Sequence, residues 1–166
     1  MANWALNTVT FKGKETKIEE IKILFEKMNE DEEQTGEGQL PYFVIEDEEH
    51  FFNIWIKKKV NESIEIDYET RGHQNVEVLV EIANHFNVDF EVTFQELEMD
   101  IFGKAIFIAG NPDAKMIVLE DEDYKKVEYL EDEDIFLYNG KEYEQFEMME
   151  ALLDEKFNNA ISQKVA

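Results

Sequence analysis

Carboxylates are the side chains of this sequence with the greatest capacity for chemistry. Forty Asp and Glu residues stand against sixteen Lys and Arg residues, so the formal net charge is −24 over 166 residues. Paired carboxylates can act as general acid and base, and clustered carboxylates can attract a basic partner. Because so many acids produce pairs by chance, the places where they cluster are more informative than their number.

Two segments and one predicted strand concentrate the acids. Residues 26–49 hold ten acidic residues and one lysine, and residues 120–134 hold nine acidic residues and two lysines. Alternation from Ser63 to Glu69 predicts a strand with Glu65, Asp67 and Glu69 on one face, about 6.6 Å apart. That approaches the spacing of phosphates along a nucleic-acid strand. Such a surface can compete for a basic nucleic-acid groove, and the alternative is an acidity that serves only solubility or adaptation to high salt.

Other chemistry has no recognisable motif here. The absence of cysteine excludes disulfides, thiolate chemistry and cysteine-based zinc sites. The three histidines lack metal-ligand spacing, no phosphate-binding glycine loop occurs, and Asp121 to Asp134 lacks the glycine and ligand spacing of an EF-hand. We therefore expect no cofactor, no specific metal site and no enzymatic activity. A hydrolase built on paired acids is the alternative within the enzyme class.

Charge and hydropathy also bear on location and on partners. An acidic surface disfavours direct binding to nucleic acid or to anionic membrane, which carry the same sign. Arg71 is the only arginine, so an RNA-binding sheet is not expected. No apolar run approaches the roughly 18 residues that span a bilayer, and Met1 to Ala5 lacks the pattern of a signal peptide. These features predict a soluble, cytoplasmic protein.

The first 110 residues predict alternating strands and helices around a core, because 43% of all residues are hydrophobic and 13% aromatic. Residues 30–39 are predicted to form a loop. The aromatic residues Trp4, Trp55, Phe51 and Phe52 are interpreted either as part of the core or as a binding platform. The predicted strands are Trp4 to Lys12, Pro41 to Ile45, Phe51 to Ile56, Ser63 to Glu69, Asp89 to Phe94, and Ile101 to Ala109 with a bulge at Gly103; the predicted helices run from an N-cap at Thr16 to Asn29 and from an N-cap at Asn75 to Phe86.

The remaining residues predict a smaller unit. Lys115 to Leu119 is a short strand, and Asn139-Gly140 is the dipeptide favoured in a type I′ hairpin between Ile135 and Tyr143. A helix follows from about Gln145. Its predicted apolar stripe consists of Phe146, Met149, Leu152, Leu153, Phe157, Ala160 and Ile161.

This element order predicts an α+β fold. Strands interrupted by two helices fit the ferredoxin-like β-α-β-β-α-β pattern, an antiparallel sheet with both helices on one face. We expect a ferredoxin-like domain at residues 1–110 and a C-terminal β-hairpin and helix at residues 111–166. The amphipathic helix needs an apolar surface, so we expect the extension to pack on the first domain.

Three short stretches of the first domain resemble a known family. They are Asn3-Trp4 with Asn7 and Val9-Thr10, then Ile66 to Arg71 followed by Asn75 and the helix to Phe86, then Phe102-Gly103-Lys104. Together they resemble the YubB-type ferredoxin-like domains of bacterial plasmid and phage proteins, over residues 1–110. The resemblance implies a ferredoxin-like fold and an origin in a mobile genetic element, and it carries over no catalytic residues.

These observations support one hypothesis and an alternative from a different class. The hypothesis is an acidic, non-enzymatic inhibitor, of the anti-restriction or anti-CRISPR type, that mimics nucleic acid and binds a basic nuclease or restriction enzyme. The alternative is a structural or regulatory domain that binds another protein through an apolar sheet or helix face. The predicted contact residues of the inhibitor are Glu65, Asp67, Glu69, Asp121, Asp123, Glu131, Asp132 and Asp134.

Overall fold

A computed structural model describes residues 3–45 and 49–165 of the chain. Residues 46–48, within the acidic segment 26–49, lie outside the described residues. The chain divides into two compact units, Met1–Met116 and Ile117–Ala166. The packing of the extension on the first domain stays a prediction.

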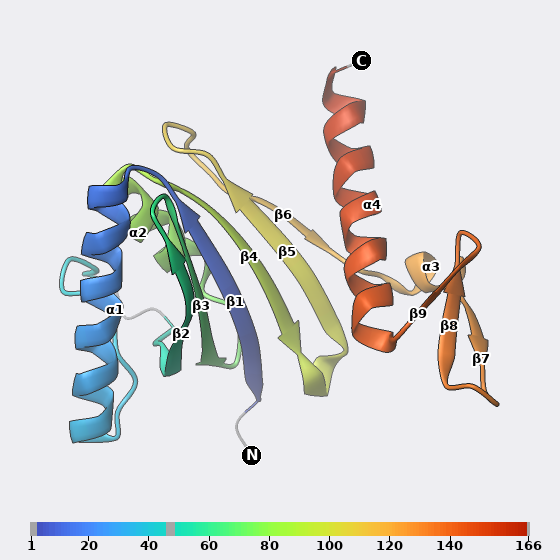
Figure 1. Ribbon diagram of the computed structural model, residues 1–166, viewed down its shortest axis with the longest axis horizontal. Helices are drawn as coiled ribbons and strands as arrows, with labels where there is room; N and C mark the ends of the chain where they lie inside the picture. Colours follow the sequence, from blue (N-terminus) through green and yellow to red (C-terminus); the bar gives the residue numbers. More distant parts are fainter. Residues whose placement is uncertain (1–2, 46–48, 166) are drawn as a thin grey trace. The chain divides into compact units, whose positions relative to one another are not determined.

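The first unit is built on an antiparallel sheet (Figure 1). The strand order is β2-β3-β1-β4-β5-β6, in which β6 crosses the boundary between the units. Two long helices and a short 3-10 helix, η1, connect the strands. The bounds are β1 (Trp4–Lys12), α1 (Glu15–Thr35), β2 (Phe52–Val60), β3 (Ser63–Arg71), α2 (Val76–Phe86), β4 (Asp89–Glu96), η1 (Leu97–Met99), β5 (Ile101–Phe107) and β6 (Lys115–Val118).

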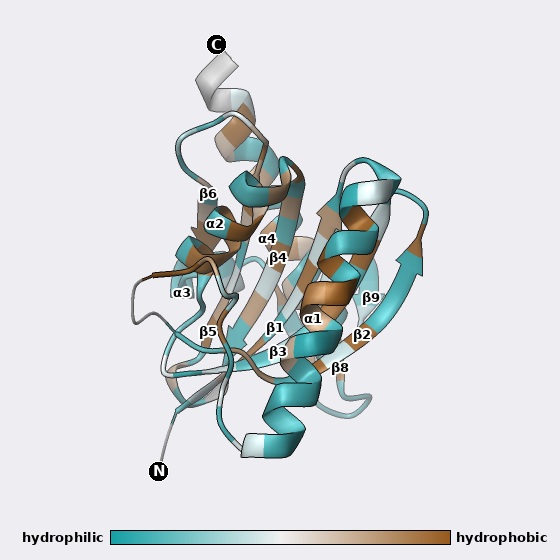
Figure 2. Ribbon diagram, turned by 90° about the vertical axis from the view of Figure 1, so that its left-hand side faces the viewer, coloured by the Kyte–Doolittle hydropathy of each residue, from teal (hydrophilic) through white to brown (hydrophobic). Residues whose placement is uncertain are grey.

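The first four strands and two helices confirm the predicted ferredoxin-like α+β fold. Their chain order is β-α-β-β-α-β and their order in the sheet is β2-β3-β1-β4. Figure 2 shows α1 and α2 in front of the same face of the sheet. Strand residues on that face are buried, because the side chains of a strand alternate between its two faces. The buried strand residues include Val9, Phe11, Ile64, Ile66, Phe90, Val92 and Phe94.

Helix α1 is longer than predicted at both ends. Its N-cap is Lys14, and Thr16, the predicted N-cap, lies in the first turn. The helix continues past Asn29 through acidic residues that were predicted to be a loop, and it ends where Gly36 adopts a φ of +72°. Glutamate is a good helix former, and an ion pair of 2.7 Å between Lys27 and Asp31 supports the last turns.

Two other local predictions are wrong. Residues 41–45 contain a turn and no strand, and the Phe43 ring stacks on His85 with the ring centroids 3.9 Å apart. Gly103 is not a bulge, because the register between β4 and β5 is continuous. The predicted N-cap of α2 at Asn75 is confirmed, but the Asn75 side chain does not cap the helix, and its Oδ1 instead accepts a hydrogen bond of 2.7 Å from the buried Tyr68 hydroxyl.

Gly13 joins β1 to α1 where no larger side chain fits. A Cβ at this position would lie 2.6 Å from Cγ1 of the buried Val88. We expect Gly13→Ala to reduce the free energy of unfolding by about 1–3 kcal/mol, the usual cost of overpacking. Urea unfolding followed by tryptophan emission measures this. The cost should fall when Val88 is also replaced by alanine; an equal cost in both backgrounds would contradict the steric explanation.

The second unit contains a small antiparallel sheet and two helices. The predicted hairpin is confirmed: Asn139 and Gly140 have φ values of +49° and +74°, as a type I′ turn requires. The C-terminal helix is also confirmed, but Phe146 and Ile161 of its predicted stripe are 51% and 40% exposed. The elements are α3 (Asp121–Tyr124), β7 (Glu128–Leu130), β8 (Ile135–Tyr138), β9 (Lys141–Tyr143) and α4 (Gln145–Val165).

Candidate functional site

The acidic row on β3 lies on the face of the strand that was predicted. Glu65, Asp67 and Glu69 are half-buried and alternate with residues that face the core. The row therefore lies on the face of the sheet opposite α1 and α2. Its regular spacing follows from the strand geometry alone.

Neighbouring strands supply a donor to each carboxylate of this row. Nζ of Lys57, on β2, lies 3.2 Å from Oε1 of Glu65 and 4.0 Å from Oδ2 of Asp67. Thr8, which faces Asp67 in the register of β1 and β3, donates a hydrogen bond of 2.8 Å to it. The amide of Asn53 donates to Glu69 at 2.6 Å. These contacts reduce the negative potential that the row presents to a partner.

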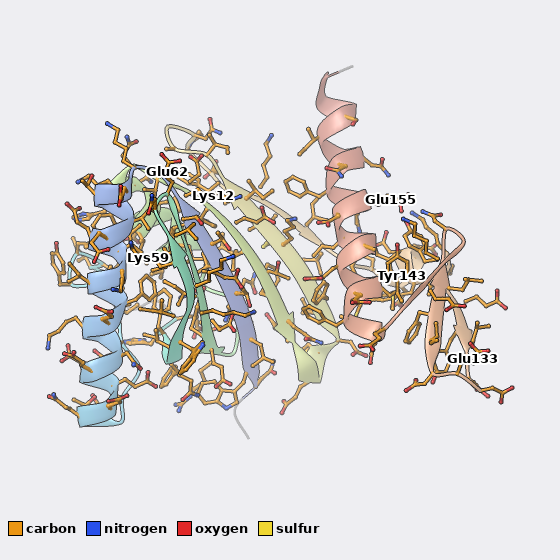
Figure 3. All side chains as sticks on the ribbon, viewed as in Figure 1. Lys12, Lys59, Glu62, Glu133, Tyr143 and Glu155 are labelled. Atoms are coloured by element: carbon orange, nitrogen blue, oxygen red, sulfur yellow. The ribbon has the colours of Figure 1, made fainter. Side chains whose placement is uncertain are left out.

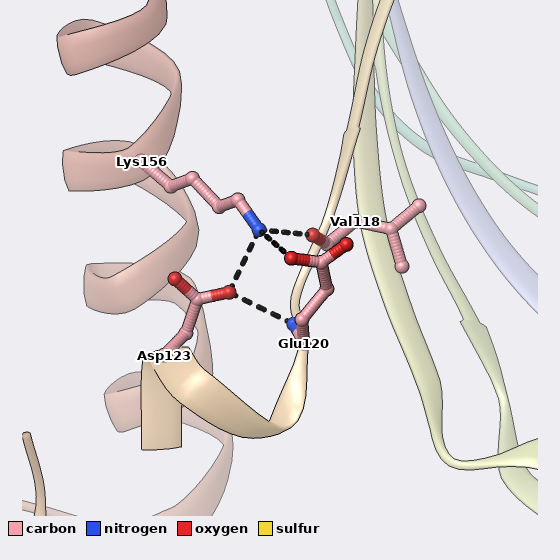
Figure 4. Close-up of polar contacts among 4 residues, drawn as sticks. All are labelled: Val118, Glu120, Asp123 and Lys156. Atoms are coloured by element: carbon pink, nitrogen blue, oxygen red, sulfur yellow. Dashed lines mark hydrogen bonds and ion pairs between the residues drawn. The ribbon is translucent and has the colours of Figure 1, made fainter. Parts of the chain in front are cut away.

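Asp123 joins three segments of the second unit (Figure 4). Its Oδ2 accepts hydrogen bonds of 2.8 Å from Nζ of Lys156 and from the backbone N–H of Glu120. The same ammonium donates to the carbonyl of Val118 at 2.9 Å and to Glu120 Oε2 at 3.4 Å. We call these four residues the Lys156 clamp. Asp121, which lies in α3 with Asp123, is exposed and does not belong to the clamp.

The two charges of the clamp shift each other's titration. Burial alone would raise the pKa of Asp123, but the hydrogen bonds from Lys156 and Glu120 and the positive charges of Lys156 and Lys126 lower it overall. Burial likewise works to lower the pKa of Lys156, and its contacts with Asp123 and Glu120 raise it overall. Asp123 therefore has a structural partner within its own unit.

The turn between β7 and β8 carries three of the predicted contact residues, and their side chains are exposed. Glu131 and Asp132 are exposed, together with Glu133, which the prediction omitted. No cation lies within ion-pair distance of these three in the part of the chain that the structure describes. Asp134 closes the turn with a φ of +52° and accepts a hydrogen bond of 2.8 Å from the Tyr129 hydroxyl. That hydrogen bond raises the pKa of Tyr129. We call residues 131–134 the acidic turn.

An open hollow of about 670 Å³ adjoins the acidic turn. Figure 3 labels two of its lining residues, Glu133 and Tyr143. Three further acids were missed by sequence reasoning, because they are dispersed over β9 and the beginning of α4. The lining residues are Glu133, Asp134, Ile135, Phe136, Glu142, Tyr143, Glu144, Gln145 and Glu147.

The eight predicted contact residues thus fall into three groups. Three form the compensated row of the first unit. Asp121 and Asp123 belong to α3, and Asp123 is held by the Lys156 clamp. The remaining three belong to the acidic turn, which together with the hollow is the candidate binding surface.

The aromatic residues near Trp55 divide between the two interpretations of the sequence. Phe51 is fully buried, as expected of a core residue. Trp55 is 67% exposed, so the core interpretation is wrong for this residue. It faces Asp67 across β2 and β3 and lies on the same sheet face as the acidic row.

Within residues 3–45 and 49–165, no three His, Cys, Asp or Glu side chains are arranged to hold a metal ion. None of the helices in this same part of the chain is long and apolar enough to cross a membrane.

Comparison with known proteins identifies a family. Neither a curated protein nor a solved structure matches the chain. The family described as a ferredoxin-like domain in Api92-like protein matches residues 51–154, which is more than half of the sequence. This range begins later than the resemblance seen in the sequence and includes the acidic turn. The chain therefore belongs to the family of ferredoxin-like domains in Api92-like proteins.

Proposed function

We propose that this protein is a non-enzymatic inhibitor that occupies the basic nucleic-acid groove of a nuclease or restriction enzyme. Its acidic surface would stand in for the phosphates of nucleic acid, as in anti-restriction and anti-CRISPR proteins. The resemblance to YubB-type domains supports an origin in a plasmid or phage, and the partner class supports a cytoplasmic location. The protein itself would not bind nucleic acid.

The observation that carries this proposal is the lack of compensation in the acidic turn. Residues 128–147 contain eight acidic residues and one lysine. Uncompensated carboxylates project a field over roughly one Debye length, about 8–10 Å at ordinary ionic strength. A basic groove would be attracted to such a turn faster than to a row whose carboxylates already accept a lysine contact or hydrogen bonds from neighbouring strands. We therefore place the main contact at the acidic turn, with the β3 row as a secondary contact.

A charge-matched pair of variants tests the proposal. The first variant is Glu131→Gln with Asp132→Asn and Glu133→Gln. The control is Glu30→Gln, Glu33→Gln and Glu37→Gln, which removes the same charge from exposed positions in and after α1. Immobilised protein would capture partners from a bacterial lysate at low salt, followed by elution with a salt gradient or with duplex DNA.

We expect the wild type and the control to retain a nucleic-acid-binding protein that salt or DNA releases, and to inhibit its activity. The acidic-turn variant should lose most of this retention, because three uncompensated charges are removed at once. Equal retention by the two variants, or release that is insensitive to DNA, would contradict the proposal.

The alternative function is an apolar interaction domain. Its support is the exposure of Trp55 and of Leu6, at 67% and 40%, on the sheet face opposite the helices. The helix stripe supports it less, since Met149, Leu153 and Phe157 are buried. A partner bound through the sheet face would resist elution by salt, and the Trp55→Ser variant would no longer retain it.

A further inference from the structure

The only arginine of the chain lies over two aromatic rings. The guanidinium carbon of Arg71 is 5.2 Å from the ring centroid of Trp4 and 5.3 Å from that of Phe52. The two rings meet edge to face, with centroids 5.1 Å apart. Trp4 is the direct partner of Arg71 in the register of β1 and β3, so the sheet itself fixes this arrangement. We call these three residues the arginine platform.

Arg71 has no carboxylate partner among the residues described, although forty acids are available in the sequence. The nearest acid along its strand face, Glu69, is two residues away, and its Oε2 is engaged by Asn53 at 2.6 Å. The side chain of Arg71 is exposed. A guanidinium that stacks on aromatic rings still has the N–H donors of its edge available, in a planar fork that matches a carboxylate.

We infer that the arginine platform is a binding site for the carboxylate of an apolar ligand, such as an acidic or C-terminal residue in an apolar peptide segment. Two observations set the ligand class. Leu6 is 40% exposed on the same sheet face, two residues from Trp4, and offers apolar surface beside the fork. The row of Glu65, Asp67 and Glu69 on the strand of Arg71 disfavours a doubly charged phosphate more than a single carboxylate.

The composition of the chain makes the test unusually direct. Because there is one arginine and two tryptophans, the Nε–H of Arg71 and the two indole N–H groups each give separate signals in a nitrogen–proton correlation spectrum. The probe is N-acetylphenylalanine, and its matched control is N-acetylphenylalanine amide, which lacks the carboxylate. Phenyl phosphate is the third ligand, and all titrations are made with the full chain at constant ionic strength.

We expect N-acetylphenylalanine to shift the signals of Arg71 and Trp4 saturably. The amide should bind about tenfold more weakly or not at all, because a hydrogen bond to a charged group is worth about a factor of ten or more. Arg71→Lys keeps the charge without the fork, and should weaken binding by a similar factor, measured at the Trp4 indole. The Trp4 indole in Arg71→Lys also reports whether the sheet remains folded.

Each remaining outcome would overturn the inference. Equal binding of acid and amide would mean that only the apolar surface is used. Tighter binding of phenyl phosphate would assign the platform to phosphate, and linear shifts in all three titrations would mean that there is no site. Because the proposed inhibitor contact lies at the acidic turn, a failure here leaves that proposal standing.

Discussion

Replacing Phe25 by alanine is expected to reduce the free energy of unfolding of the first unit by about 3–5 kcal/mol. Phe25 is fully buried on α1. Its ring centroid lies 6.1 Å from that of Phe11 on β1 and 5.3 Å from that of Phe51, beside the start of β2. The substitution removes a large apolar side chain and leaves a cavity between the helix and the sheet. The protein therefore loses the free energy of burying that side chain and also bears the cost of the cavity.

Urea unfolding followed by tryptophan emission measures this effect, because Trp4 and Trp55 both belong to the first unit. The control is Ile23→Ala, at a position of α1 that is 57% exposed. We expect the control to change stability by less than about 0.5 kcal/mol. A similar loss in both variants would contradict the assignment to burial, because alanine is the better helix former at both positions.

The second large effect is expected in the second unit, on replacing Lys156 by methionine. The variant keeps the apolar stem but removes the ammonium that contacts Val118, Glu120 and Asp123. Asp123 would be left without its cation, with a side chain only 15% exposed. We expect a loss of about 1–3 kcal/mol, the usual cost of an unsatisfied, partly buried polar group.

Amide hydrogen exchange of α3 and α4 measures this loss in the second unit directly. Lys126→Met removes a lysine charge at an exposed position near α3 and should have little effect. If exchange in α4 were equally fast in both lysine variants, the Lys156 clamp would contribute nothing beyond net charge.

The clamp also predicts how the stability of the second unit depends on pH. The pKa of Asp123 is lowered from its ordinary value of 3.8, so its contribution is present above that value and is lost as pH falls through the lower folded-state pKa. The pKa of Lys156 is raised from 10.5, so its contribution is present below that value and is lost as pH rises through the higher folded-state pKa. Asp123→Asn should remove the acid dependence that Asp123 contributes to the stability of the second unit and leave the stability of the first unit unchanged.

Periodicity and turn chemistry were sufficient to predict most of the elements. The alternation around Ile64 and Ile66 predicts β3 because a strand has only two faces, and one of them must be buried. Asn139-Gly140 predicts its hairpin because both residues tolerate positive φ. These signals are local, so they do not depend on the rest of the fold.

The errors occurred where local signals compete. The acidic residues after Asn29 favour a helix by propensity but oppose it by repulsion, and the ion pair of Lys27 with Asp31 supports the helix. Residues 41–45 have the composition of a strand, but they form a turn in which Phe43 stacks on His85 of α2, a residue far away in the sequence.

The sequence by itself determined the excess of negative charge, the ferredoxin-like order of elements and the face of β3 on which Glu65, Asp67 and Glu69 lie. Only the tertiary structure decided which of the acids are paired. Thr8 donates to Asp67 across strands that are distant in the chain, and Lys156 pairs with Asp123 from another helix. Compensation of a charge depends on distances of a few ångströms between such elements, and these distances are fixed only when the core and the register are formed.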